Sequence, residues 1–132
     1  MSGWAERATI SPLETFREHL RRGELAFPYS LEAQRAFFFP RLACPYTGSE
    51  RIEWRVSRGL GTVYATTWIR PREGDAYNVA LVDVDEGFRL MTRIEGVAPE
   101  SVAIGTRVRV RIHEAPGEEA PYPVFVPLDS AK

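Results

Sequence analysis

The stretch Arg107-Val108-Arg109-Val110-Arg111-Ile112 alternates cationic and apolar side chains with a period of two residues. This period predicts a β-strand that turns valine and isoleucine towards a core and arginine towards the opposite face. Within another predicted strand, 77–84, the apolar set comprises Val79 and Leu81, and in part also Val82 and Val84. The remaining strand patterns lie at 52–70, where Gly59 and Gly61 suggest a bulge, at 89–97 and at 122–126.

The order of these elements predicts a barrel. Residues 99–105 have the pattern of a short helical turn, which falls between the third and the fourth of the five predicted strands. Five strands with one helical turn at that place are the element order of the OB fold, a small Greek-key barrel. We therefore predict a mainly β protein with an OB-fold domain at 52–127 and a C-terminal tail at 128–132.

Residues 1–23 are predicted to form an N-terminal tail and one helix. Ser11 is placed as an N-cap, Pro12 occupies the first helical position, and Glu14 completes a capping box, while Gly23 marks the end. A helix this short is marginal in water, so its apolar face must dock on another surface. That face comprises Leu13, Phe16 and Leu20.

The segment 24–51 shows no regular period. It contains three prolines, the run Phe37-Phe38-Phe39 and a turn at 45–49. Such a segment cannot build a core of its own, so we expect its aromatic side chains to pack on an outside surface.

Composition excludes several classes of protein. The chain has 132 residues, one cysteine and a formal net charge of −1. A single cysteine allows no internal disulfide, no CxxC pair and no four-cysteine zinc site. The near-neutral charge disfavours binding to polyanions through global basicity. Because no apolar run approaches the ~20 residues of a membrane span and no leader pattern is present, we expect a cytoplasmic protein without a membrane partner.

Several segments in a fixed order resemble a known family. They are Cys44-Pro45-Tyr46-Thr47-Gly48-Ser49, Glu53-Trp54, GLGTVY at 59–64, VALVDV at 79–84, LMTRIEG at 90–96 and Ile104-Gly105. The resemblance covers about residues 11–127 and is to bacterial and archaeal proteins that join an N-terminal helix, a rubredoxin-like zinc ribbon and a C-terminal OB fold. Members are associated with acyl-CoA metabolism, often as non-catalytic partners of thiolase-like enzymes. The resemblance implies a ribbon at 24–51.

The resemblance also implies where zinc ligands would stand. The four ribbon positions fall near Ser30, Ala33, Cys44 and Thr47, and only Cys44 is a cysteine. Structural zinc takes four ligands, and serine, alanine and threonine do not replace thiolates. We therefore expect a degenerate, metal-free ribbon without zinc, in which Cys44 is a relic ligand.

No set of residues in the sequence forms a recognisable catalytic constellation. His19 and His113 belong to no motif that would make Cys44 a nucleophile. We therefore expect a chain that is not itself an enzyme, binds no covalent cofactor, and binds acyl-CoA beside a thiolase-like or other acyl-CoA enzyme subunit. A purely structural subunit without a ligand is one alternative. Binding of single-stranded nucleic acid is another, but it is disfavoured by acidic loops at 71–76 and 114–121.

Two groups of cations and one aromatic run are the candidate ligand-binding residues. Arginine can bind phosphate in a bidentate fork, and an acyl or pantetheine arm needs an apolar slot. A solvated outer face for the cations and core packing for the aromatics remain the alternatives. The candidates are Arg21, Arg22, Phe37, Phe39, Arg41, Arg107, Arg109 and Arg111, with Arg35 in the same group as Arg41.

Overall fold

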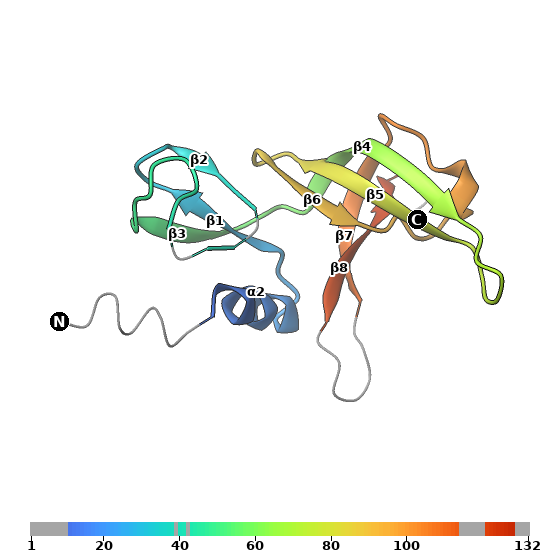
Figure 1. Ribbon diagram of the computed structural model, residues 1–132, viewed down its shortest axis with the longest axis horizontal. Helices are drawn as coiled ribbons and strands as arrows, with labels where there is room; N and C mark the ends of the chain where they lie inside the picture. Colours follow the sequence, from blue (N-terminus) through green and yellow to red (C-terminus); the bar gives the residue numbers. More distant parts are fainter. Residues whose placement is uncertain (1–10, 39, 42, 114–120, 129–132) are drawn as a thin grey trace.

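The computed structural model describes residues 11–38, 40–41, 43–113 and 121–128. They form one helix and two antiparallel sheets (Figure 1). The helix is α2 (Pro12–Arg21). The smaller sheet has the order β2-β1-β3 and the larger one the order β6-β5-β4-β7-β8. The strands are β1 (Ala26–Ser30), β2 (Arg35–Ala36), β3 (Ile52–Val56), β4 (Leu60–Ile69), β5 (Tyr77–Val84), β6 (Phe88–Thr92), β7 (Arg107–His113) and β8 (Tyr122–Pro127).

The larger sheet closes into the predicted OB-fold barrel. Beyond the end of β6, a parallel bridge joins Ile94 to Phe125 of β8. The amide of Glu95 donates to the Phe125 carbonyl at 2.8 Å, and the Phe125 amide donates to the Arg93 carbonyl at 3.0 Å. The 3₁₀ turn η1 (Pro99–Ser101) falls between β6 and β7. The mainly β fold class and the OB fold are therefore confirmed.

The single long strand predicted for 52–70 is wrong. β3 pairs with β1 of the smaller sheet, with Ala26 opposite Val56, and β4 begins the barrel. Between them, Glu86 accepts hydrogen bonds from the Ser57 hydroxyl at 2.6 Å and from the Arg58 amide at 3.0 Å, which turns the chain. The irregularity in β4 lies between Val63 and Ala65, beyond the glycines where the sequence suggested a bulge.

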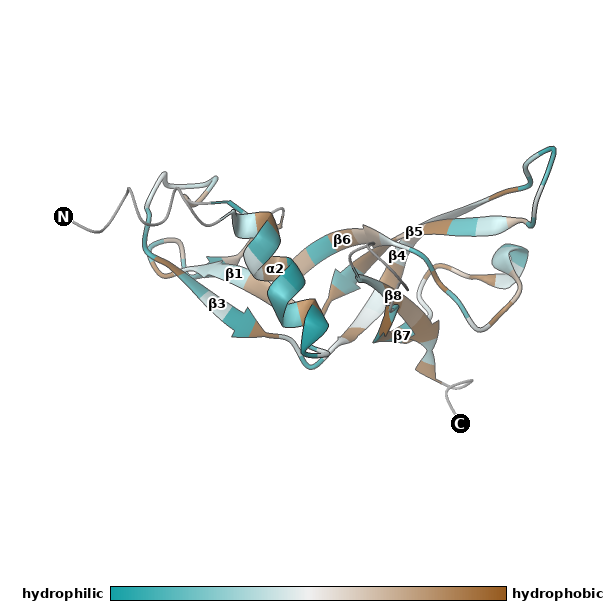
Figure 2. Ribbon diagram, turned by 90° about the horizontal axis from the view of Figure 1, so that it is seen from below, coloured by the Kyte–Doolittle hydropathy of each residue, from teal (hydrophilic) through white to brown (hydrophobic). Residues whose placement is uncertain are grey.

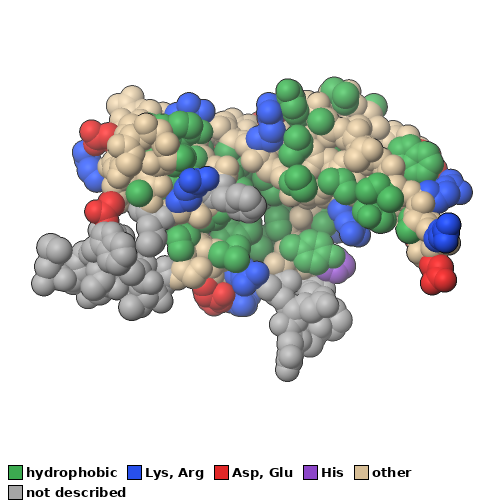
Figure 3. All heavy atoms as spheres, viewed as in Figure 1, with side chains coloured by type: hydrophobic (Ala, Val, Ile, Leu, Met, Phe, Trp, Pro, Cys, Tyr) green, Lys and Arg blue, Asp and Glu red, His purple; other side chains and the backbone are tan. Residues whose placement is uncertain are grey.

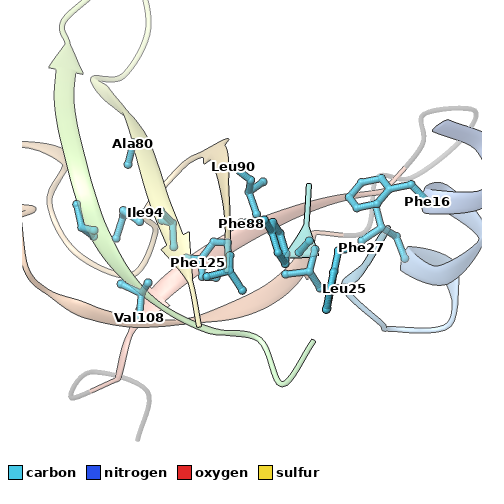
Figure 4. Packing of buried hydrophobic residues seen from close by; sticks show 14 residues of the cluster. Phe16, Leu25, Phe27, Ala80, Phe88, Leu90, Ile94, Val108 and Phe125 are labelled. Carbon is cyan, nitrogen blue, oxygen red and sulfur yellow. The ribbon is translucent and has the colours of Figure 1, made fainter. Parts of the chain in front are cut away.

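The segment 24–51 contains two strands that its sequence did not reveal. β1 is buried along almost all of its length, so it shows no alternation of polar and apolar residues. Its Phe27 packs on Phe88 of β6 with ring centroids 4.8 Å apart. The buried cluster runs without a break from α2 and β1 into the barrel (Figure 4). Phe27, Tyr29 and Phe38 of this segment therefore share a core with the barrel, as expected of its aromatic side chains.

Helix α2 begins and ends as predicted. The Ser11 side chain accepts a hydrogen bond from the Glu14 amide at 3.4 Å, and Gly23 has φ +80°. Phe16 and Leu20 are buried, but Leu13 is 44% exposed, so its predicted place on the docked face is wrong. α2 contacts β1 and β8, and the side of the helix seen in Figure 2 is mainly hydrophilic.

The inward face of β5 contains Val82 and Val84 of the predicted apolar set, but not Val79 and Leu81. Its buried residues are Asn78, Ala80, Val82 and Val84, while Val79 and Leu81 point outwards and are half-buried. Asn78 is tolerated inside because its side chain donates to the Thr67 carbonyl at 3.0 Å and accepts from the Ile94 amide at 3.1 Å. A buried asparagine therefore hid the true core face, and the strand is apolar on both sides.

Candidate functional site

Phe38 separates two hollows at the junction of α2, the smaller sheet and the barrel. Its ring meets Phe16 of α2 edge-on, with centroids 5.3 Å apart, and stacks on Phe88 of β6 at 5.4 Å. Phe38 lines both hollows: one is also lined by Phe88, at the start of β6, and the other by Leu90, further along the same strand. This aromatic wall comes from three elements that are far apart in sequence.

The first hollow, which we call the apolar hollow, has a volume of about 360 Å³. It lies between α2, β6 and β8, beside the Ile94–Phe125 bridge that closes the barrel. Met91 is 70% exposed and Arg93 is also exposed, so one side of the hollow is open to solvent. Its lining is Phe16, Phe38, Val79, Leu90, Met91, Thr92, Arg93, Tyr122, Pro123 and Val124. Such a lining suits an alkyl chain.

The second hollow, which we call the arginine hollow, has a volume of about 400 Å³ and lies between the smaller sheet and the β5–β6 turn. The Arg35 guanidinium stands over the Tyr46 ring at 3.9 Å. Arg89 donates to Asp83 at 2.6 Å and stands 3.5 Å from the centre of the Tyr64 ring. The hydrogen bond to Asp83 raises the pKa of Arg89. Two guanidinium groups on an aromatic wall suit a phosphate group.

The structure does not bring the predicted arginine strand to either hollow. Arg107 donates to both Asp85 oxygens at 2.8 Å, which lowers the pKa of that carboxyl, and Arg111 is paired with Glu95. Arg109, on the same strand, lines neither hollow. The three side chains therefore lie on an outer barrel face, where Arg107 and Arg111 pair with carboxylates.

The candidates on the N-terminal side are divided. Arg21 pairs with Glu14 at 2.9 Å and with Glu18 at 2.5 Å, and Arg22 lies 3.5 Å from Glu24. Arg41 is exposed, and within the described part of the chain it makes no ion pair. Phe37 and Arg35 do line the arginine hollow. Phe39 lies outside the described residues, as does most of the 114–121 loop.

The four predicted ribbon positions gather around Cys44. The Ser30 hydroxyl accepts from the Ala33 amide at 3.0 Å, and the Cys44 sulfur accepts from the Tyr46 amide at 3.3 Å. The side chains of Ser30 and Thr47 are hydrogen-bonded to the thiol. Cys44 is buried, and among the described residues no group of three His, Cys, Asp or Glu side chains could hold a metal. The degenerate, metal-free ribbon at 24–51 stays a prediction.

This environment makes a prediction for the acidity of Cys44. Burial raises the pKa of the thiol, but hydrogen bonds from Ser30, Thr47 and the Tyr46 and Thr47 amides outweigh it and lower the pKa to about 7. An unfolded cysteine has a pKa of about 8.5, so the folded state binds its proton less tightly. We therefore expect up to about 2 kcal/mol of stability that is present above pH 8.5 and lost as pH falls through 7.

The pH dependence of the ultraviolet absorbance of the thiolate measures this pKa directly, and urea unfolding at several pH values measures the stability. The Ser30→Ala variant should raise the pKa of Cys44, whereas Ser57→Ala, remote from the thiol, should leave it unchanged. A pH dependence of stability that survives in Cys44→Ser would contradict the assignment.

Sequence reasoning missed most of the residues that form the two hollows. Phe38 was noticed only as part of an aromatic run, and Met91 and Arg93 only as members of the predicted strand 89–97 and of the LMTRIEG segment. Arg89 was not considered. One signal could have found them: 89–93 reads Arg-Leu-Met-Thr-Arg, with a large apolar residue between two arginines on the outward face of a strand.

The helix, the small sheet and the closed barrel together define an OB-fold protein with an N-terminal extension. Residues 54–113 match the family model described as ChsH2, C-terminal OB-fold domain. The resemblance noted from the sequence, to an OB-fold family associated with acyl-CoA metabolism, is therefore confirmed.

Two solved structures are similar to this chain. One is described as an Ltp2-ChsH2(DUF35) aldolase; its matching chain is 29% identical, with a TM-score of 0.77 over 89% of this chain and 95% of that one. The other is a DUF35-family protein of unknown function from Sulfolobus solfataricus, 20% identical, with a TM-score of 0.60 over 74% of this chain and 75% of that one. The second likeness supports the fold alone.

A curated relative is also similar. It is a probable enoyl-CoA hydratase alpha subunit from Thermomonospora curvata, 35% identical over 94 residues. The match takes in 67% of this chain but only 28% of the relative, so this chain corresponds to about a quarter of that protein.

These names overturn one expectation. From the sequence we expected a chain that is not an enzyme, but one similar structure is named an aldolase and the curated relative an enoyl-CoA hydratase subunit. Both point to a role in an enzyme complex. The absence of a motif was a poor guide, because a subunit's role in a reaction need not leave a catalytic motif in its own sequence. Separately, no helix among the described residues is long and apolar enough to cross a membrane.

Proposed function

We propose that this chain is a subunit of an enzyme complex of lipid or polyketide metabolism that acts on acyl-CoA thioesters, together with a thiolase-like or aldolase partner. The comparisons support this role, because one similar structure is named an Ltp2-ChsH2(DUF35) aldolase and the curated relative a probable enoyl-CoA hydratase alpha subunit. The observation that carries the ligand class is the pair of hollows on either side of Phe38.

The two hollows complement the two ends of an acyl-CoA. The apolar hollow of about 360 Å³ offers contacts to an acyl chain, and the arginine hollow offers Arg35 and Arg89 to phosphate groups. Phe38 forms a wall of both. We therefore place the acyl chain along Leu90 and the phosphates near Arg35, with the pantetheine arm passing the Phe38 ring. Arginines on a half-open surface also steer an anionic ligand towards its site.

Calorimetric titration with two classes of ligand, acyl-CoAs and acyl-pantetheines, tests this placement. Butyryl-CoA and longer acyl-CoAs should bind with affinity that rises by up to about fourfold for each added methylene until the apolar hollow is full. The corresponding acyl-pantetheines, which lack the phosphates, should bind more weakly. Arg35→Ala should weaken acyl-CoA binding by about tenfold and leave acyl-pantetheine binding unchanged.

The matched control is Arg17→Ala on α2, because Arg17 is a half-exposed arginine whose partner, Glu14, is 3.9 Å away and lies in neither hollow. This control should bind like the wild type. Equal weakening by both variants, or no heat with any acyl-CoA, would refute the proposed ligand class and favour a structural subunit without a ligand.

A further inference from the structure

The outer face of the barrel over β4, β5 and β6 is unusually apolar. Strand register puts Leu81 opposite both Ala65 and Met91, and Val79 opposite Thr67. These side chains point away from the core, whose β5 members are Asn78, Ala80, Val82 and Val84. When one face of a sheet is in contact with water, the residues on that face are normally polar. An apolar outer face therefore needs an explanation. We call it the outer face: Tyr64, Ala65, Thr67, Ile69, Tyr77, Val79, Leu81 and Met91.

Arginines stand beside the aromatic residues of the outer face. Arg89 lies 3.5 Å from the Tyr64 ring centre, and Arg93 lies 5.2 Å from that of Tyr77. Arg89 is paired with Asp83, whereas no ion pair joins Arg93 to another described residue. Figure 3 shows hydrophobic side chains with arginines among them over this part of the barrel. Tyrosine, methionine and arginine are the residues enriched where proteins bind one another.

The outer face is continuous with the candidate site. Val79, Met91 and Arg93 line the apolar hollow, and Val79 and Met91 also belong to the outer face. A protein that covered the outer face would therefore also cover the open side of the hollow. Its own residues would then stand beside a ligand held there.

The charge of this surface distinguishes between two occupants. In a symmetric pair, a second copy would present the same face, and the Asp83 carboxylate beside it is already paired with Arg89. Arg93 would then face another arginine-bearing surface without a counter-ion. A different protein with an apolar patch and a carboxylate at its rim would cover the apolar residues of the outer face and also pair with Arg93.

We propose that the outer face is the docking surface for a partner enzyme subunit, which buries Met91, Val79 and Leu81 under an apolar patch, pairs a carboxylate with Arg93 and closes the apolar hollow. The inference rests on the proposed function for the nature of the partner. The position of the docking surface rests on the exposed apolar residues of the outer face and on Arg93 beside them.

Photo-crosslinking in cells of the source organism tests the surface. The full chain would carry p-benzoylphenylalanine at Met91 or, in a second variant, at Thr67, and crosslinked proteins would be identified by mass spectrometry. Ile104 is the matched control, because it is an apolar side chain 69% exposed, against 70% for Met91, and lies outside the outer face. We expect crosslinks from Met91 and Thr67, but not from Ile104, to an enzyme subunit of acyl-CoA metabolism.

A charge reversal completes the test. Arg93→Glu should reduce the crosslink yield from Thr67 at least tenfold. Arg70→Glu should not, because Arg70 stands over Trp68, at 5.4 Å, beyond the end of β4. A crosslink to a second copy of this chain, equal yield from Ile104, or no crosslink at all would overturn the proposal.

Failure of this proposal can be told apart from failure of the proposed function. If purified chain binds acyl-CoA but the enzyme subunit crosslinks only from Ile104, the surface is wrong and the function stands. If Met91 and Thr67 crosslink specifically to a protein that is not an enzyme subunit, the proposed occupant is wrong and the function must be judged on acyl-CoA binding.

Discussion

Replacing Gly61 by alanine should lower the free energy of unfolding by about 3 kcal/mol. Gly61 lies in β4 directly against β5, and an added Cβ would stand 2.6 Å from a methyl carbon of Val82 and 2.8 Å from the backbone oxygen of Asp83. Val82 is fully buried, and the oxygen belongs to a paired strand. Neither neighbour can give way without moving the strand. Urea unfolding followed by circular dichroism measures the change.

Gly74→Ala is the matched control for this prediction. Gly74 has φ +96°, yet nothing lies within 4 Å of an added Cβ. Its replacement should therefore cost only the strain of a left-handed backbone, about 1 kcal/mol. If Gly61→Ala is no more destabilising than Gly74→Ala, the close approach of β4 and β5 is not a constraint on stability.

Removing the Asn78 side chain should have the second large effect. Its amide group donates to the Thr66 hydroxyl at 2.6 Å and to the Thr67 carbonyl at 3.0 Å, and its oxygen accepts from the Ile94 amide at 3.1 Å. Asn78→Ala would leave backbone groups of two segments unsatisfied inside the barrel, at a cost of about 3 kcal/mol. Because Ile94 forms the closing bridge to Phe125, we expect the loss of stability to be largest where the barrel closes.

Hydrogen exchange distinguishes this local role from general destabilisation. In Asn78→Ala, the Glu95 and Phe125 amides, which bond across the closure, should exchange faster relative to those within the β4–β5 pair. Thr66→Ala removes one partner of Asn78 and should cost only about 1 kcal/mol. Equal protection across the barrel in Asn78→Ala would contradict a closing role for Asn78.

The parts of the fold that could be predicted are those with local signals. The Ser11–Glu14 cap of α2 and the alternation of β7 are written within a few neighbouring residues, and both are found as predicted. β1 could not be predicted, because a strand buried on both faces has no period and this one contains Pro28. β3 was assigned to the barrel, because local pattern does not tell which sheet a strand joins.

The candidate site was less accessible to prediction than the fold. Arg107 and Arg111 attracted attention because they alternate, but each has found a carboxylate from another element, Asp85 and Glu95. Phe38 becomes a wall only because α2 and β6 bring Phe16 and Phe88 to it. No spacing of residues in the sequence indicates that these three phenylalanine rings are in contact.

The sequence by itself determined helix α2, the OB-fold barrel and the family resemblance, because capping residues, strand periods and motif order are local properties of the chain. Only the tertiary structure decided which face of β5 is the core. Both faces are apolar, and the choice depends on Asn78 finding Thr67 and Ile94 across the barrel. The same choice leaves Val79, Leu81 and Met91 on the outside, where the proposed docking surface begins.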